Sequence, residues 1–409
     1  MLTQPTLPSL NDVVSAAELL SEVSLKTPFE RSNVLSNQNG ADVYLKFENR
    51  QHTNSFKMRG AFVKLCSLSQ EQRRRGVVAA SAGNHAQGVA YHAARMNIDA
   101  TIVMAANTPF TKVRRTQALG ARVILHGANL AQALALALEM TTSQGLTFIT
   151  GYDDPRVIAG AGTVGLEMLQ ADPDLDALVV PVGGGGLISG IAIAAKAMYP
   201  QMEIIGVQTE LFPALYNVLH DLEKPVGGPT LAEGVAVTTV GALNVAVARE
   251  LVDDVVLVDE PSIERAIHFL LDEEKTVVEG AGAIGVAAIL KYAQRFAGRR
   301  IATILSGGNI DTGLLASLIA RTRLTEGRVV RLRAHMVDAP GGLAQVAAIV
   351  AEFGANVLDV SHHRTFTDVS AKCMELDMTI EQQNPRDVLA IVERLRVAGY
   401  QTNLLDGVD

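Results

Sequence analysis

The sequence of 409 residues contains no tryptophan, only two cysteines, and aromatic side chains at only 4% of its positions. The two cysteines, Cys66 and Cys373, lie far apart and outside any metal-ligand spacing. Neither a disulfide framework nor a zinc site is therefore predicted. This cysteine usage fits a reducing compartment, and we expect a cytoplasmic protein.

Basic residues are also scarce, because 35 lysines and arginines face 43 aspartates and glutamates, for a net charge of −8. A protein that binds the backbone phosphates of DNA or RNA normally presents a basic face. Residues 1–12 are polar and unlike a secretory signal, and the most apolar region, 178–198, is broken by glycines and contains Lys196. We therefore expect a soluble protein that binds a small charged molecule rather than nucleic acid or a membrane.

Hydrophobic residues make up 48% of the chain and are largely Ala, Val, Ile and Leu, which favours an α/β enzyme. Short β-rich segments alternate with alanine-rich helical segments, as in parallel sheets covered by helices. The strands expected on this basis are residues 76–80, 100–104, 122–125, 177–181, 203–208 and 300–305, and the helices expected around the first three are residues 85–96, 111–119 and 130–144.

The alternation predicts two sheets within a catalytic domain that spans residues 1–325. The first sheet belongs to a small sub-domain at about residues 50–155, inserted in a larger one whose alternation resumes near Ile158. A short charged connector at residues 325–327 marks a domain boundary. Beyond it, residues 328–409 follow the order βαββαβ, the split βαβ or ferredoxin-like arrangement.

Lys57 stands among small and apolar residues, shortly after an expected strand at residues 43–47. A partly desolvated lysine loses its proton more easily and can then attack an aldehyde as a neutral amine. A single lysine is more commonly a solvated surface residue, so this interpretation depends on the neighbouring motifs.

Four consecutive glycines at residues 183–186 directly follow the expected strand 177–181 and directly precede an expected helix at residues 188–198. Their backbone N–H groups, with the positive end of the helix, form a phosphate cradle. The Gly-Lys-Ser/Thr of a nucleotide-triphosphate loop is missing, so that site is excluded. The alternative interpretation is a flexible glycine turn.

Two further polar loops follow expected strands: residues 306–309, which begin with Ser306, and residues 81–88, which contain Asn84. Ligands of open α/β sheets bind at the carboxyl edge where such loops lie. Asn84 and the surrounding backbone donors suit a carboxylate or a phenolate. Each loop alone could be a capped turn, but four such motifs at strand ends predict one ligand site.

The motifs SFKMRGA at Lys57, SAGNHAQG at Ser81, the tetraglycine loop and SGGN at Ser306 resemble, in this order, the fold-type II pyridoxal-phosphate enzymes. Within this tryptophan synthase β-like fold, the chain is most similar to threonine dehydratases (threonine ammonia-lyases) and serine racemases, over roughly residues 19–323. The resemblance implies pyridoxal 5′-phosphate as the cofactor. It also implies that Lys57 binds the cofactor covalently, that Asn84 bonds its ring oxygen and that Ser306 faces its pyridine nitrogen.

By the same resemblance, the cofactor-binding residues are Phe56, Lys57, Asn84, Gly183, Gly184, Gly185, Gly186, Leu187, Ser306 and Gly307. The residues implied for the substrate carboxylate are Ser81, Ala82, Gly83, Asn84 and His85.

The chemistry of Ser306 agrees with this assignment. A serine hydroxyl can donate a hydrogen bond to a neutral pyridine nitrogen, whereas a carboxylate would keep that nitrogen protonated. The cofactor is then a weaker electron sink, which favours prompt loss of a β-hydroxyl after Lys57 takes the α-proton. The predicted reaction converts L-threonine to 2-oxobutanoate and ammonia, and also L-serine to pyruvate.

Three residues depart from the family pattern. In some relatives one segment binds a divalent cation through residues that match Glu210 and the Ala214 carbonyl, and here Tyr216 replaces an acidic residue of that segment. Because a carboxylate ligand is lost, no metal is expected. Glu210 is interpreted as a solvated or helix-capping acid. Ala161 replaces a common glutamine and Glu233 an aspartate, which affects the expected substrate geometry and not the reaction class.

Two alternatives remain. On the same scaffold the chain could be a serine racemase or a hydroxyaspartate dehydratase. In a different class, it could be an amino-acid-binding regulatory protein that keeps the catalytic fold only as architecture. The C-terminal domain argues against the racemase, and so does Ala82, which stands where racemases carry a proton-donating serine.

Residues 328–409 resemble an ACT domain, which implies pairing with a second copy, as a homodimer or homotetramer, and binding of an amino-acid effector. The loop at residues 338–342 offers free backbone donors before an expected helix, suited to a carboxylate. The expected effector residues are Gly341, Gly342, Leu343 and Asn356. Our hypothesis is that the protein is an allosteric enzyme at the start of isoleucine biosynthesis and that isoleucine inhibits it. The alternative is that this domain only mediates dimerisation and binds no ligand.

Overall fold

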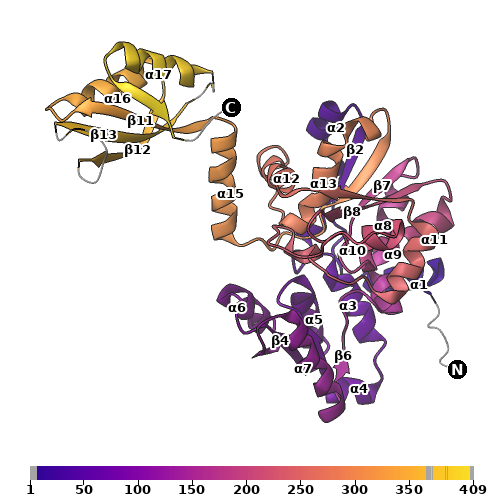
Figure 1. The fold of residues 1–409 in the computed structure, drawn as a ribbon. Helices are drawn as coiled ribbons and strands as arrows, with labels where there is room; N and C mark the ends of the chain where they lie inside the picture. The colour runs from indigo at the N-terminus through magenta and orange to yellow at the C-terminus, as the bar shows by residue number, and fades with distance from the viewer. Residues whose placement is uncertain (1–6, 365–369, 371, 383, 385, 406–409) are drawn as a thin grey trace. The chain divides into compact units, whose positions relative to one another are not determined.

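The computed structural model describes residues 7–364, 370, 372–382, 384 and 386–405. The chain divides into two compact units, Met1–Ile310 and Asp311–Asp409 (Figure 1). The first six residues of the polar N-terminal segment lie outside the described residues, and so do Ala371, within a strand expected at residues 370–380, and Pro385, at which an expected helix begins. In the described part of the chain, no helix has both the length and the apolar character needed to cross a membrane.

A six-stranded sheet forms the centre of the first unit, in the order β1-β2-β10-β7-β8-β9. Only β1 runs antiparallel to its neighbour. All five residues of β7 are buried, as expected for a parallel strand covered on both faces. The strands are β1 (Phe29–Arg31), β2 (Asp42–Lys46), β7 (Ala177–Pro181), β8 (Glu203–Thr209), β9 (Asp254–Val258) and β10 (Arg300–Ile304).

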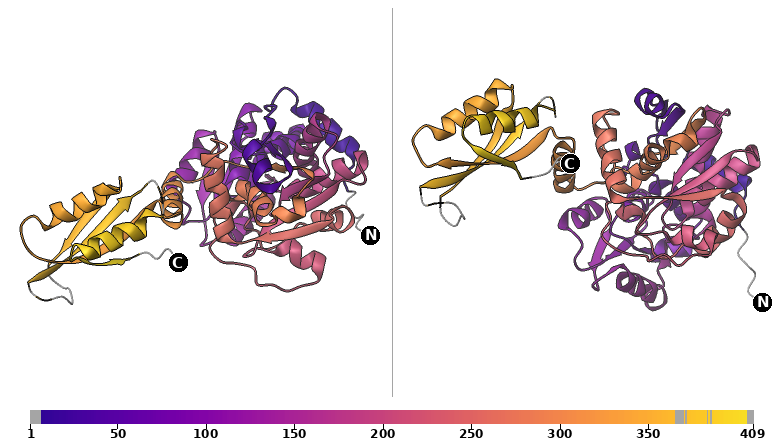
Figure 2. Two further views of the ribbon diagram at one scale, coloured as in Figure 1. Left: turned by 90° about the horizontal axis from the view of Figure 1, so that it is seen from above. Right: turned by 45° about the horizontal axis from the view of Figure 1, so that its top comes forward.

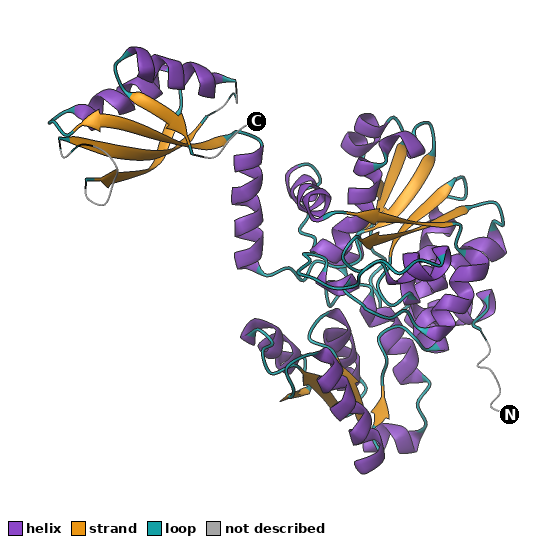
Figure 3. Ribbon diagram, viewed as in Figure 1, coloured by secondary structure: helices purple, strands orange, loops and turns teal. Residues whose placement is uncertain are grey.

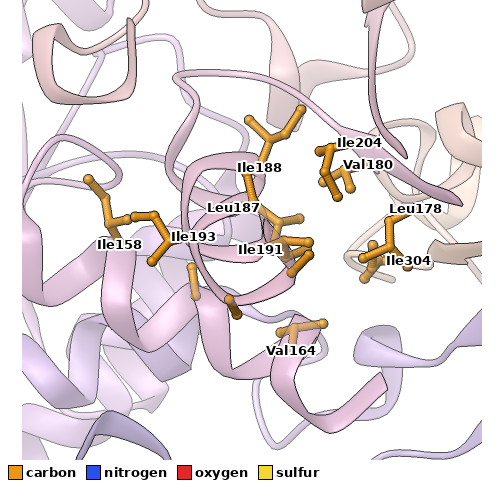
Figure 4. Packing of buried hydrophobic residues seen from close by; sticks show 14 of the residues in the cluster. Ile158, Val164, Leu178, Val180, Leu187, Ile188, Ile191, Ile193, Ile204 and Ile304 are labelled. Atoms are coloured by element: carbon orange, nitrogen blue, oxygen red, sulfur yellow. The ribbon is translucent and has the colours of Figure 1, made fainter. Parts of the chain in front are cut away.

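Apolar side chains of α8 and α9 pack on this sheet and form the main core (Figure 4). The two helices can approach closely because residue 162 is a glycine: a Cβ atom there would lie only 2.6 Å from the Gly190 carbonyl oxygen. The helices of this part are α1 (Leu10–Leu20), α2 (Asn33–Asn39), α8 (Pro155–Ala171), α9 (Gly186–Met198), α10 (Ala214–His220), α11 (Ala242–Leu251), α12 (Glu260–Asp272), α13 (Gly280–Lys291) and α14 (Ala293–Phe296), with the short 3-10 helices η1 (Glu48–Arg50) and η2 (Glu233–Val235).

A smaller parallel sheet, in the order β5-β4-β3-β6, lies in the same unit. Its strands are β3 (Val77–Ala80), β4 (Ala100–Met104), β5 (Arg122–Leu125) and β6 (Thr147–Phe148), and the helices of this part are α3 (Lys57–Cys66), α4 (Gln70–Arg75), α5 (Asn84–Arg95), α6 (Phe110–Ala118) and α7 (Leu130–Ser143). The expected strands appear within one residue at each end. The strand expected from Gly76 begins one residue later, at Val77, because Gly76 has a φ of 92°, a positive value that glycine favours and that a strand does not contain.

The C-terminal unit begins with α15 (Thr312–Thr325) and continues as an antiparallel sheet in the order β12-β13-β11-β14. Both of its later helices cover the same face of that sheet (Figures 1 and 2). The elements are β11 (Val329–Val337), α16 (Gly342–Glu352), β12 (Asn356–His363), β13 (Cys373–Glu381), α17 (Asp387–Val397) and β14 (Gln401–Leu404). This is the βαββαβ order expected from the sequence, and the predicted fold class is confirmed.

The helix α15 belongs to the C-terminal unit in the structure, whereas the division drawn from the sequence, 1–325 and 328–409, keeps it with the catalytic part. Arg323 pairs with Glu381 at the end of β13, and Gln382 donates a hydrogen bond of 2.7 Å to the Gly327 carbonyl oxygen. These contacts anchor α15 and the connector to the ferredoxin-like sheet. The sequence-based division stays our proposal for the functional domains.

Candidate active site

The order of the larger sheet brings three of the predicted motifs together. Strand β10 lies between β2 and β7, and parallel neighbours present their carboxyl ends at one edge. The segment leading to Lys57 follows β2, the Ser306 loop follows β10, and the four glycines follow β7. The backbone N–H of Phe56 donates to the Ser306 carbonyl oxygen at 3.2 Å. These loops gather between the two sheets (Figure 3).

The smaller sheet contributes its own carboxyl edge to the same place. Strand β3 leads into residues 81–84, and its neighbour β6 leads to Gly151. The Lys57 Nζ atom donates a hydrogen bond of 2.8 Å to the Gly151 carbonyl oxygen. The four motifs predicted from the sequence therefore converge between the two sheets of the first unit.

Lys57 is the first residue of α3 and is partly buried. A small pocket includes Lys57 and the apolar side chains of Phe56, Val157 and Leu187. Burial lowers the pKa of the Lys57 ammonium to about 8, because the charged form is poorly solvated there. About a tenth of the lysine is thus a neutral amine at pH 7, far more than for a solvated lysine, and this form can act as a nucleophile or a base.

A buried ion-pair network holds α3 in position. The Arg59 guanidinium, fully buried two residues after Lys57, bonds Glu48 at 2.8 Å and Glu167 at 2.6 Å. Lys46 also reaches Glu167, at 2.6 Å. The network ties α3 to β2, η1 and α8, and removal of Arg59 would leave the buried Glu48 carboxylate without its ion-pair partner, at a cost of about 3–5 kcal/mol. The sequence contained no signal for this network.

The glycine loop has the shape of an anion cradle at the N-terminus of α9. A Cβ atom at Gly184 would lie 2.3 Å from the Tyr152 ring, and one at Gly185, whose φ is 98°, would lie 2.6 Å from Asn244 Cβ. Asn244 donates to the Gly184 and Tyr152 carbonyl oxygens at 2.9 and 3.1 Å, while its buried Oδ1 has no protein partner. Only glycines fit here, and the backbone stays accessible to a phosphate.

Ser306 is buried at the end of β10, and its hydroxyl donates to the Ala281 carbonyl oxygen at 3.3 Å. The family resemblance implies that Ser306 faces the pyridine nitrogen of the cofactor, and in the structure its hydroxyl bonds the start of α13. Next to it, Ser55 pairs with Gly307 through the backbone, and its fully buried Oγ has no partner. The Ser55 hydroxyl is therefore free to bond a ligand, whereas the Ser306 hydroxyl would have to leave the Ala281 carbonyl oxygen to donate to a bound ring.

The loop after β3 contains the residues predicted for a substrate carboxylate. Ser81, Ala82, Gly83 and Asn84 are all partly exposed, and the Ser81 hydroxyl accepts the Gly83 N–H at 3.2 Å. The next residue differs, because the buried His85 imidazole bonds the Ile149 carbonyl oxygen at 2.8 Å through Nε2.

Burial lowers the pKa of His85 to about 4, so its ring is neutral near pH 7. The carboxylate-binding role predicted for His85 is therefore restricted to its backbone N–H, since the ring is committed to the loop beyond β6.

Glu279 is a site residue that the sequence reasoning missed. It precedes α13, is partly buried, and its Oε1 accepts a hydrogen bond of 2.5 Å from Asn84 Nδ2. Burial raises the pKa of the Glu279 carboxyl to about 7, despite the hydrogen bond from Asn84. The sequence contains one feature that could have pointed to Glu279: it is the only acidic residue in the segment VVEGAGA, between apolar residues and small ones.

The expected effector residues do not form one site within a single chain. Gly341, Gly342 and Leu343 lie at the N-terminal end of α16, where Gly341 has a φ of 91°. Asn356 begins β12, just beyond the other end of that helix. An α-helix of this size separates the two positions by about 16 Å at 1.5 Å per residue.

No group of three or more His, Cys, Asp or Glu side chains that could hold a metal ion occurs among the residues that the structure describes. In the segment that matches the cation site of some relatives, Glu210 pairs with Lys291 at 3.0 Å, and Lys291 also pairs with Asp259 at 2.7 Å. Glu210 is exposed, which agrees with its interpretation as a solvated acid, and its carboxylate also forms this surface ion pair.

Comparison with known proteins assigns both parts of the chain. The family model described as pyridoxal-phosphate dependent enzyme matches residues 20–307, and that of the ACT domain matches residues 330–399. L-threonine ammonia-lyase of Thermotoga maritima is 43% identical over 399 residues, which cover 97% of this chain and 99% of that protein.

Two solved structures are similar to the catalytic part. The processed form of threonine deaminase isoform 2 from Solanum lycopersicum matches with a TM-score of 0.73 and 36% identity, covering 78% of this chain and 91% of that one. Maize serine racemase matches with a TM-score of 0.73 and 31% identity, covering 78% of this chain and 99% of that one.

Proposed function

The chain belongs to the family of pyridoxal-phosphate-dependent enzymes and carries an ACT domain, and from this premise we propose that it converts L-threonine to 2-oxobutanoate and ammonia, and also L-serine to pyruvate. The observation that carries the proposal is the Lys57 amine, with its pKa lowered to about 8, in the same cleft as a phosphate cradle. The near full-length likeness to an L-threonine ammonia-lyase supports the choice of substrate.

The residues present fit pyridoxal 5′-phosphate. Gly183, Gly184, Gly185, Gly186 and Leu187 would hold the phosphate at the N-terminus of α9, where a side chain would close the cradle. Lys57 would hold the aldehyde carbon. Around the ring, Phe56, Asn84, Ser306 and Gly307 would supply packing and hydrogen bonds, and the unpartnered Ser55 Oγ is a further polar atom at this position.

When bound, the cofactor withdraws electrons from the α-carbon of an amino acid, so that its α-proton becomes acidic. The Lys57 Nζ atom takes this proton as a neutral amine, which the low pKa makes available. The partly exposed loop of Ser81, Ala82 and Gly83 orients the substrate carboxylate through its backbone donors. Phe56 and Leu187 cover the amine, and the β-hydroxyl takes up a proton and leaves as water. Hydrolysis of the released enamine then gives the 2-oxo acid and ammonia.

The C-terminal domain binds an amino-acid effector in this proposal, and two copies of it pair. Because the helix α16 separates Gly341 from Asn356, one effector could contact both residues only if they came from different copies. Isoleucine is the proposed inhibitor, and a homodimer or homotetramer the proposed assembly. We also propose a cytoplasmic location, supported by the two unpaired cysteines, Cys66 and Cys373.

The product pattern from a panel of hydroxy amino acids tests the proposal. Purified protein with added cofactor is incubated with L-threonine, L-serine and hydroxyaspartate, and ammonia and 2-oxo acids are measured. We expect 2-oxobutanoate and ammonia in equal amounts from L-threonine, and pyruvate from L-serine. A protein that binds the cofactor but releases ammonia only from hydroxyaspartate, or from no substrate, would refute the assignment.

A further inference from the structure

Glu279 crosses the cleft from the larger sheet to the smaller one. Its backbone N–H donates to the Gly307 carbonyl oxygen at 3.0 Å, in the loop after β10. Its Oε1 accepts from Asn84 Nδ2, at the start of α5. A Cβ atom at position 307 would lie 2.2 Å from this Oε1 and 2.9 Å from Asn84 Nδ2, so the glycine makes room for the contact.

Both ends of the Asn84 amide are held. Its Oδ1 accepts a hydrogen bond of 2.7 Å from Asn309 Nδ2, which also bonds the Thr53 carbonyl oxygen at 2.9 Å. Its Nδ2 gives one hydrogen to Glu279. Because a primary amide has two N–H hydrogens, one of them remains for a ligand. The amide therefore has one defined orientation, with nitrogen toward Glu279 and oxygen toward Asn309.

The charge of Glu279 is maintained against an unfavourable environment. Burial is the largest influence on its pKa and raises it to about 7, while Lys112 on α6 lowers it and Glu233 on η2 raises it. A carboxyl kept partly ionised in a cleft of this kind is typical of a functional position. The bond to Asn84 is the interaction that opposes this burial most strongly.

We propose that Glu279 is a positioning residue, which fixes the Asn84 amide so that its remaining N–H faces the ring oxygen of the bound cofactor. The inference rests on the proposed function, since it takes pyridoxal phosphate as the occupant of this cleft. Without Glu279, only the bond from Asn309 holds the amide, so its remaining N–H is less firmly directed at the ring oxygen. Glu279 then acts on the ring's orientation and electronic state, and not on the substrate directly.

The test uses the full-length protein with its cofactor and three variants: Glu279→Ala, Glu279→Gln and, as the control, Glu273→Gln. The control removes the negative charge of an exposed side chain at the end of α12, and Glu273 is not among the groups that shift the Glu279 pKa. The readouts are the visible absorption spectrum of the cofactor, its dependence on pH, kcat and KM for L-threonine, and thermal unfolding.

We expect Glu279→Ala to load the cofactor with a shifted absorption maximum and to lose about tenfold in kcat, with KM changed by less than about twofold. Glu279→Gln keeps an acceptor for Asn84, so its spectrum should stay close to the wild type. It should lose the part of the spectral pH dependence that is centred near the Glu279 pKa of about 7. Glu273→Gln should keep the wild-type spectrum and its pH dependence.

A cofactor-loaded Glu279→Ala variant with the wild-type spectrum and kcat would overturn this inference, while threonine turnover by the wild type would leave the proposed function standing. If Glu279→Ala does not fold, the Glu279→Gln variant decides, because a wild-type pH dependence in it also overturns the inference. If the wild type binds no cofactor, the proposed function itself fails.

Discussion

Lys57 Nζ donates a hydrogen bond of 2.8 Å to the carbonyl oxygen of Gly151, which joins the first residue of α3 to the loop after β6. The bond holds the amine over the junction of the two sheets. It uses a hydrogen of the amine and leaves the nitrogen lone pair of the neutral form free. The reactivity of Lys57 should therefore follow its protonation state.

The first prediction concerns pH. The pKa of Lys57 lies at about 8 because burial disfavours the ammonium, so below that pH the neutral fraction, and with it the rate of cofactor uptake, should rise about tenfold per pH unit. Above it the rate should level. Stopped-flow absorbance on cofactor-free protein measures this profile. An inflection near 10.5, the ordinary value for lysine, would contradict the burial of the amine.

A matched variant tests the cause. The Phe56 ring centroid lies 5.2 Å from Lys57 Nζ and shields it from water. Phe56→Ser should move the inflection upward, because a hydrated ammonium is easier to keep charged.

The phosphate cradle makes a second prediction. Gly184→Ala should weaken cofactor binding by at least about tenfold, since its Cβ atom would meet the Tyr152 ring. Fluorescence titration with the cofactor measures the affinity, and thermal unfolding checks that the fold is kept. The double variant Gly184→Ala with Tyr152→Ala should recover part of the loss. Unchanged affinity in the single variant would remove the glycine loop from the site.

The third prediction separates elimination from racemisation. Ala82, in the partly exposed loop between β3 and α5, has a methyl group that cannot donate a proton. L-Serine should give pyruvate with little D-serine, and Ala82→Ser should raise the D-serine fraction. Chiral chromatography of the products measures both. D-Serine as a main product of the wild type would favour the racemase alternative.

The fourth prediction concerns regulation. A chain ending at Thr325 keeps α15, lacks the ACT domain and should bind the cofactor, turn over threonine and ignore isoleucine. A chain ending at Ile310 also lacks α15, which belongs to the C-terminal unit, and it shows whether that helix is needed for activity. If the full-length enzyme shows no change in threonine kinetics with isoleucine, valine or adenine nucleotides, the regulatory interpretation fails.

The sequence predicted the family, the fold class and the place of the main loops because these depend on local patterns. A strand followed by glycines and a helix is visible within some fifteen residues, as at residues 177–191, and several such patterns at strand ends point to one edge of a sheet. The fold class, the family and the cofactor class are confirmed by the structure and the family matches. The roles of individual site residues stay predictions.

The residues that were missed depend on contacts between distant parts of the chain. Asn84 meets Glu279 only because the loops after β3 and before α13 face each other across the cleft. The same holds for the buried pair of Arg59 and Glu167, in which neither residue is marked by its neighbours in sequence. The effector residues stay a prediction: Gly341 and Asn356 lie at opposite ends of α16, so a shared ligand would depend on a second copy of the domain, which the sequence of one chain cannot place.

The central claim is that Lys57 carries out the elimination of water from threonine, after which hydrolysis of the product gives 2-oxobutanoate and ammonia. Its most direct test is a parallel assay of wild-type protein and Lys57→Ala with L-threonine and added cofactor. Both 2-oxobutanoate and ammonia are measured, and borohydride reduction followed by peptide mapping locates the bound cofactor. The account predicts equal amounts of the two products and a label on Lys57 in the wild type, and neither turnover nor a labelled lysine in the variant. A Lys57→Ala protein that still releases both products, or that carries the label on another lysine, would contradict it.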